Sequence, residues 1–188
     1  MTTPTDAVLG KTANSTSSKP MYQEEIVTRP GVRKILAFAR ITIGFTFVWA
    51  FVDKLFGLGF ATPSERAWIN GGTPAQGFIG GIEGPFSGLF QMFLNPFGDV
   101  LFMVGLLGIG LAMMLGAGLK VAAVTGTLLL FFMYLAQFPP ATVDSNNPIV
   151  DSHWHEALLL IISAATLSGD TWGVGKMWGR IVGNGWLR

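Results

Sequence analysis

Four long apolar stretches, separated by polar or glycine-rich connections, organise this chain. They predict helices at about residues 35–58, 99–117, 120–138 and 149–168. A helix needs about 20 mainly apolar residues to cross the hydrocarbon core of a bilayer. A soluble protein would have to bury all four stretches with almost no amphipathic surface. The pattern therefore predicts an all-α fold, an integral membrane four-helix bundle.

The segments around these stretches suggest three parts. Residues 1–32 are polar and rich in Ser and Thr, which predicts a flexible cytoplasmic tail, with docking on a partner as the alternative. Residues 33–170 form the membrane domain. Its 59–98 connection is aromatic but broken by Gly and Pro, as expected for an outer lid of short interfacial helices. Residues 171–188 alternate Trp with basic residues, which is typical of an interfacial segment.

Basic residues distinguish the two ends of the predicted bundle. Connections rich in Lys and Arg face the cytoplasm in most membrane proteins. Such residues flank the first helix, the short turn between the second and third helices, and the end of the fourth: Arg29, Arg33, Lys34, Lys120, Lys176, Arg180 and Arg188. The other two connections are mainly acidic. Both termini are therefore expected in the cytoplasm, with the chain in the bacterial plasma membrane.

Composition removes several classes of chemistry. Only 12% of the residues are charged, about half the share of a typical soluble domain, so membrane lipids are the expected surroundings. A net charge of +1 offers no basic field for nucleic acid. The chain has no cysteine, which excludes thiol relays, thiolate-bound zinc and all-cysteine iron–sulfur clusters. No haem ligation is evident either, because both histidines lie at the start of one helix.

Small residues recur at helical spacing in the second and third stretches. Gly108, Ala112 and Gly116 lie four residues apart, with Gly105 on the same side, and Ala122 and Gly126 repeat the pattern in the third stretch. Small side chains at this spacing let helices approach closely in lipid. We expect this face to pack inside the bundle, with a homodimer interface as the alternative.

Three charges within the first helix need an explanation, because charged groups at membrane depth are costly. Arg40 lies about two turns from the cytoplasmic end, where it either snorkels to the inner headgroups or faces a buried partner or an anion. Asp53 and Lys54 are adjacent near the outer end and diverge by about 100° on a helix. They cannot form one surface pair, and a structural ion pair with another helix end is the favoured interpretation.

The start of the fourth helix carries the only two histidines. On a helix His153 and Glu156 share a face, and so do Asp151 and His155. Asp151 is either a helix cap or a group that fixes one histidine tautomer, leaving the other ring nitrogen for a quinone oxygen or a water. No metal site is expected, because His153 and His155 point about 200° apart on a regular helix.

The predicted topology brings these outer groups to one membrane face. The end of the first helix, the start of the fourth and the long connection all lie there. We therefore expect one outer polar site, with His153, Asp151, Lys54, Asp53 and Glu156 as its candidate catalytic residues.

Several motifs resemble one known family, DoxX/DoxD. Arg40-Ile41-Thr42-Ile43-Gly44-Phe45 with Trp49, followed by Asp53-Lys54-Leu55-Phe56-Gly57, is similar to its first helix. Residues 67–74, residues 105–110 and Asn147-Pro148 with Asp151 and His153 are similar to its later parts, in the same order. The likeness covers about residues 33–180 and is strongest to actinobacterial members. His155 and Glu156 depart from the family pattern.

The resemblance implies a four-helix membrane subunit linked to quinone-dependent respiratory redox chemistry, such as thiosulfate:quinone oxidoreduction. It carries over to Arg40, Asp53, Lys54, Asp151 and His153. Quinone would be the cofactor, with His153, Arg40 and Trp49 as its contacts. The alternative is a non-catalytic accessory subunit of a respiratory-chain oxidase complex. Both hypotheses expect other membrane or respiratory subunits as partners.

Overall fold

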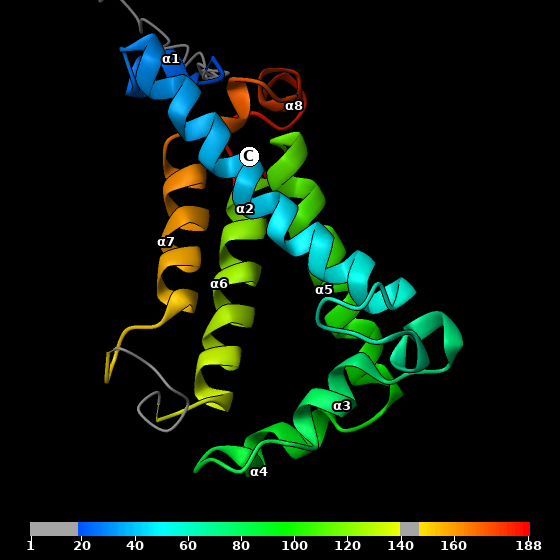
Figure 1. Cartoon of the computed structure of the whole chain (residues 1–188). Helices are drawn as coiled ribbons and strands as arrows, with labels where there is room; N and C mark the ends of the chain where they lie inside the picture. Colours follow the sequence, from blue (N-terminus) through cyan, green and yellow to red (C-terminus); the bar gives the residue numbers. More distant parts are fainter. Residues whose placement is uncertain (1–18, 140–146) are drawn as a thin grey trace, which may run out of the picture.

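The computed structural model describes residues 19–139 and 147–188, and all regular structure in these ranges is helical (Figure 1). Three helices are long and apolar enough to cross a membrane: α2 (Pro30–Phe56), α5 (Pro96–Leu115) and α6 (Leu119–Ala136). The all-α prediction is thus confirmed, and the length and composition of the three helices suggest a membrane protein. The fourth predicted helix is shorter than expected, because α7 (Ser152–Ala165) has only 14 residues.

Helix α2 begins and ends at sequence signals. Pro30 occupies its first turn, where a missing N–H costs nothing, and Gly57 ends it in the left-handed conformation. With 27 residues it exceeds the length needed to span a bilayer upright. In Figure 1 it crosses the other long helices obliquely.

Helices α5, α6 and α7 run alternately up and down. Asn95 caps α5 by accepting a hydrogen bond from the Gly98 N–H at 3.1 Å. Gly116 and Gly118 both adopt positive φ in the tight turn between α5 and α6. The most extensive contacts join α2 to α5 and α6 to α7.

The core is small and lies where α2, α5, α6 and α7 meet. Its buried members include Phe47, Ile109, Met113, Leu130 and Leu160. Many large apolar side chains instead face outward, as expected where lipid replaces water around the helices.

Short helices occupy the long connection between α2 and α5. They are η1 (Ser64–Arg66), η2 (Trp68–Asn70), α3 (Pro74–Ile79), α4 (Ser87–Phe90) and η3 (Gln91–Phe93). A second, smaller core formed by Ala75, Ile79, Phe90 and Ala136 joins α3 and α4 to the end of α6. Figure 1 shows α3 and α4 lying across the ends of the long helices.

The opposite end is closed by both terminal segments. They comprise α1 (Gln23–Ile26), η5 (Ser168–Asp170) and α8 (Gly175–Val182). Residues 1–18 of the predicted flexible tail lie outside the described residues. Residues 19–32 differ from that prediction, because Gln23 is fully buried and α2 begins at Pro30.

Only part of the predicted small-residue pattern packs closely. A Cβ on Gly126 of α6 would lie 2.6 Å from the Leu160 side chain of α7, and one on Gly116 would lie 2.6 Å from the Cα of Gly169.

The contact between α2 and α5 uses other glycines. A Cβ on Gly110 would lie 2.8 Å from the backbone nitrogen of Val48 on α2, and one on Gly44 would lie 2.8 Å from that of Met114 on α5. A Cβ on Gly105 or Gly108 would meet nothing within 4 Å. The stripe that includes Gly105 and Gly108 therefore faces open space, and another face of α5 contacts α2.

This difference predicts opposite effects for one substitution at two positions of α5. Gly110→Ala should destabilise the fold by about 1–3 kcal/mol, because the backbone of α2 has to move. Gly108→Ala should be neutral or stabilising by up to about 1 kcal/mol through helix propensity. Unfolding of both purified variants in one detergent, followed by circular dichroism, measures this. Equal stability of the two variants would contradict the α2–α5 packing.

Candidate functional site

Arg40 is the largest fully buried side chain, and backbone oxygens surround it. Its guanidinium donates to the carbonyls of Met113 and Met114, at 2.8 Å for the latter. It also donates to the carbonyls of Thr171 and Trp172 at 3.3 and 3.1 Å. One side chain of α2 thus binds the end of α5 and the segment that precedes α8.

The position of Arg40 has a clear electrostatic reason. The last carbonyls of a helix have no partner within it, and they carry the negative end of its dipole. Met113 and Met114 lie in the last turn of α5. Arg40 satisfies their carbonyls and balances the dipole, so it faces buried partners and does not snorkel to the surface.

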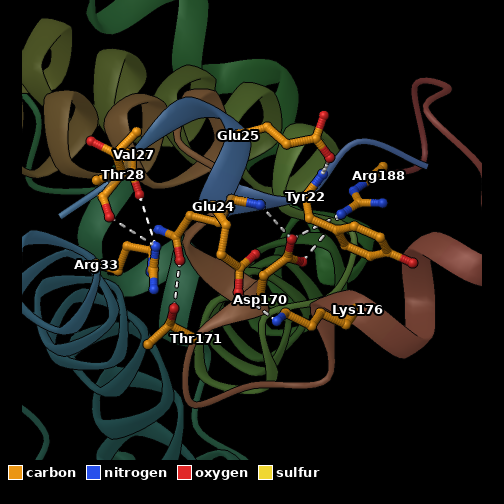
Figure 2. A network of polar contacts seen from close by, with 11 residues as sticks. Tyr22, Glu24, Glu25, Val27, Thr28, Arg33, Asp170, Thr171, Lys176 and Arg188 are labelled. Atoms are coloured by element: carbon orange, nitrogen blue, oxygen red, sulfur yellow. Dashed lines mark hydrogen bonds and ion pairs between the residues drawn. The ribbon is translucent and has the colours of Figure 1, made fainter. Parts of the chain in front are cut away.

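A buried ion pair within the C-terminal segment supports the contact of that segment with the N-terminal one (Figure 2). The guanidinium of Arg188 donates to both oxygens of Asp170, at 3.2 and 3.0 Å. Asp170 also accepts the backbone N–H of Gln23 at 2.9 Å, and the Gln23 side-chain oxygen accepts the Thr171 hydroxyl at 2.6 Å. Burial raises the pKa of Asp170, while Gln23 and Arg188 oppose that rise.

A more exposed pair lies beside it. Lys176 of α8 donates to Glu24 of α1 at 2.5 Å, and this hydrogen bond lowers the pKa of Glu24. The ammonium also lies 6.0 Å from the centre of the Tyr22 ring. Exposed pairs of this kind contribute at most about 1 kcal/mol, so the buried hydrogen bonds of Gln23 with Asp170 and Thr171 are the main link between the two segments. We call the four charged residues and Gln23 the terminal clasp.

At the outer end of α2, Asp53 is buried and bonded to the following turn. Its carboxylate accepts the N–H groups of Phe60 and Ala61 at 3.2 and 3.0 Å. Lys54 points elsewhere, with its ammonium 6.0 Å from the centre of the Phe102 ring of α5. The expected divergence of the two side chains is present, but the ion pair favoured for them is not observed among the described residues.

Asp99 plays a similar part that sequence reasoning missed. It lies in the first turn of α5 and accepts the backbone N–H groups of Ala75 and Gln76 at 2.7 and 3.1 Å. The Gln76 side chain donates to it at 2.5 Å. Asp99 thereby satisfies the start of α3 and attaches α3 to α5. Its place just after a capping Asn-Pro pair signals a helix start, but nothing local signals the contact with α3.

Asp151 and His153 form a pair at the start of α7. One oxygen of Asp151 accepts the backbone N–H of His153 at 3.1 Å, and the other lies 2.7 Å from its Nδ1. Both side chains are mostly covered: that of Asp151 is 16% exposed and that of His153 is 11% exposed. Glu156 follows on the same face and is half-buried, whereas His155 is exposed. Asp151 is thus both the helix cap and the group that orients the ring.

The structure does not bring the predicted outer residues into one site. Figure 1 places the end of α2 beside α5, and the start of α7 on the far side of α6. Asp53 and Lys54 therefore form one group, and Asp151, His153 and Glu156 another. Trp49 belongs to neither group and packs edge-on against Phe60, with 5.1 Å between ring centres. Within residues 19–139 and 147–188, no cluster of three or more His, Asp or Glu could hold a metal ion.

The main cavity lies between α5 and α6 and has a volume of about 700 Å³. Small residues of α5 line one wall and Val121 and Thr125 of α6 the other. The Thr125 hydroxyl is bonded to the Val121 carbonyl of its own helix at 2.9 Å. The lining is otherwise almost wholly apolar, and none of the candidate site residues belongs to it. We call this cavity the α5–α6 groove.

The chain was compared with protein-family models, with curated proteins and with solved structures. No match was found in any of the three. The resemblance to DoxX/DoxD therefore stays a prediction that rests on the motifs quoted above.

The role of Arg40 predicts a large effect of neutralising it. Arg40→Met should destabilise the fold by about 3–5 kcal/mol, because several buried carbonyls lose their donor. Arg180→Met is the matched control, since Arg180 is exposed on α8 at the same end of the molecule. Thermal unfolding in detergent measures both variants. A stable Arg40→Met protein would contradict the structural role.

Proposed function

We propose that this chain is a DoxX/DoxD-type subunit of the bacterial plasma membrane that acts as a non-catalytic accessory subunit of a respiratory-chain oxidase complex. One observation carries the proposal. Arg40 and Asp53, two of the charges expected to do chemistry, and Asp99 are each bonded to backbone groups of the chain itself. Groups used in this way hold the fold together and are not available to a substrate.

The proposal includes four membrane crossings with both termini in the cytoplasm. The three long helices supply three crossings, and α7 is assigned as the fourth because it packs along α6. The starts of α2 and α6 and helix α8 lie at one end in Figure 1, and most of the basic residues near the helices belong to them. The positive-inside rule supports a cytoplasmic position for that end.

The oxidase assignment predicts a specific co-purification. The tagged chain, extracted from native membranes in a mild detergent, should carry haem absorbance and quinol-dependent oxygen consumption with it. A harsh detergent should remove both while the chain itself stays folded. An unrelated tagged membrane protein is the control.

A chain that migrates alone in the mild detergent, together with unchanged respiration after its deletion, would contradict the proposal. Substituting Lys54 by Met should leave the oxygen consumption of the co-purified complex unchanged, because the proposal gives this residue no chemical role.

A second candidate, quinone-linked proton transfer, is favoured by the pair at the start of α7. Asp151 lies 2.7 Å from His153 Nδ1, which suits a ring whose Nε2 exchanges a proton with a quinone or a water. Glu156 on the same face would take part in that exchange. Electrons would come from a partner or a bound cofactor.

Two histidines in one turn of chain allow a matched test of this second candidate. If it holds, His153→Gln lowers quinone-dependent turnover by about 100-fold or more, as expected for loss of a general acid or base. His155→Gln leaves turnover unchanged, because His155 is exposed. Turnover and thermal stability are measured on the complex with its native partners. If both variants keep full turnover, the pair is a helix cap.

A further inference from the structure

The α5–α6 groove is closed at both ends by elements outside the two helices. At the outer end its lining includes Phe78 of α3 and Phe93 of η3. At the inner end it includes Trp178 of α8 and Leu187. The Trp178 indole donates to the Leu187 carbonyl at 2.6 Å, which holds this inner cover together. The groove is therefore bordered at both ends, and its open side would face lipid.

These boundaries decide between two kinds of apolar occupant. A membrane-spanning helix is about 10 Å wide and 30 Å long. Residues of α3 and η3 border the groove at one end and residues of α8 at the other, so such a helix could not continue past them. The groove has a volume of about 700 Å³. This volume lies in the usual range for small ligands. A thin, flexible hydrocarbon chain fits the recess from the side.

The lining further restricts the occupant. Small-molecule pockets usually place a few polar groups where the ligand's polar atoms lie. Here the one hydroxyl near the middle, that of Thr125, is bonded to its own helix. A headgroup therefore has no partner inside the groove and must lie at one of its ends.

The inner end offers a cation. Lys120 lies between the groove-lining residues Gly118 and Val121, and it donates to the Gly185 carbonyl at 3.1 Å, two residues before Leu187. Within the described part of the chain this is its one hydrogen bond, so two N–H groups of the ammonium are left. Basic pockets on the cytoplasmic side of membrane proteins bind anionic headgroups.

We propose that the α5–α6 groove binds one anionic phospholipid, with an acyl chain against Gly105 and Gly108 and the phosphate at Lys120. The absence of side chains at the two glycines creates the space for the acyl chain. Lys120 selects the charge of the headgroup. The site requires no other subunit, so its test is independent of any oxidase complex.

The test uses the full chain, purified and delipidated in detergent, and native mass spectrometry. The probes are phosphatidylglycerol and phosphatidylcholine with identical acyl chains. The wild type should retain one phosphatidylglycerol in preference to phosphatidylcholine. Gly108→Leu should lower retention of both lipids at least about fivefold by filling the groove. Gly31→Leu is the control, because a Cβ there also meets open space but lies outside the groove.

A second pair of variants tests the headgroup. Lys120→Gln should reduce the preference for phosphatidylglycerol about fivefold and leave phosphatidylcholine retention unchanged. Lys34→Gln, which removes another cation at the same end, should change neither. Val104→Trp, at an exposed position on the groove rim, replaces Gly108→Leu if that variant fails to fold.

Three results would overturn the proposal. Equal lipid retention by the wild type and the groove-filling variant would mean that lipid binds only around the outside. A wild-type dimer that Gly108→Leu separates without loss of lipid would assign the groove to a second copy. An unchanged headgroup preference in Lys120→Gln would show that Lys120 does not bind an anionic headgroup.

Discussion

The hydrogen bonds of the Arg40 guanidinium hold together the end of the molecule where both terminal segments lie. Arg40 joins the last turn of α5 to the backbone of Thr171 and Trp172, so three parts of the chain meet at one side chain. Its burial is tolerated because the carbonyls it binds would otherwise be unsatisfied, and because they carry the negative end of a helix dipole. The tight turn at Gly116 and the start of the C-terminal segment are both built around this contact.

At the opposite end of the molecule, carboxylates bind backbone groups as Arg40 does, with the opposite sign of charge. Asp53, Asp99 and Asp151 each accept backbone N–H groups at a turn or a helix start. Buried backbone N–H groups need an acceptor, and carboxylates fixed in the fold supply it. This shared constraint explains why the expensive charges are spread over separate helix ends and do not form one site.

The long apolar helices were predictable because their signal is local. Length and hydropathy identify α2, α5 and α6, and proline or glycine marks several of their ends. The shortness of α7 was less predictable, because its first turns are polar and a left-handed Leu167 follows soon after its end. The pairing of Gln23 with Asp170 could not be predicted, since the contact joins residues 147 positions apart.

The candidate site was predictable only within one turn. Helical spacing placed Asp151 on one face with His155, but Asp151 is the N-cap with extended backbone, and its carboxylate contacts His153 instead. The expected meeting of this pair with Asp53 and Lys54 depends on how α2 crosses the bundle, and helical spacing does not contain that angle. For the same reason the spacing of Gly105 and Gly108 marks a face of α5 but does not say whether a helix or a groove lies against it.

The bonds of Arg40 also set an order of events during synthesis. Thr171 and Trp172 leave the ribosome 131 and 132 residues after Arg40, when the long helices have already been made. Until then the guanidinium lacks half of its partners, and an unsatisfied charge at membrane depth is costly. Arg40 can therefore acquire its full set of hydrogen bonds only after the C-terminal segment has been made, so the last part of the chain completes the environment of a residue in the first long helix.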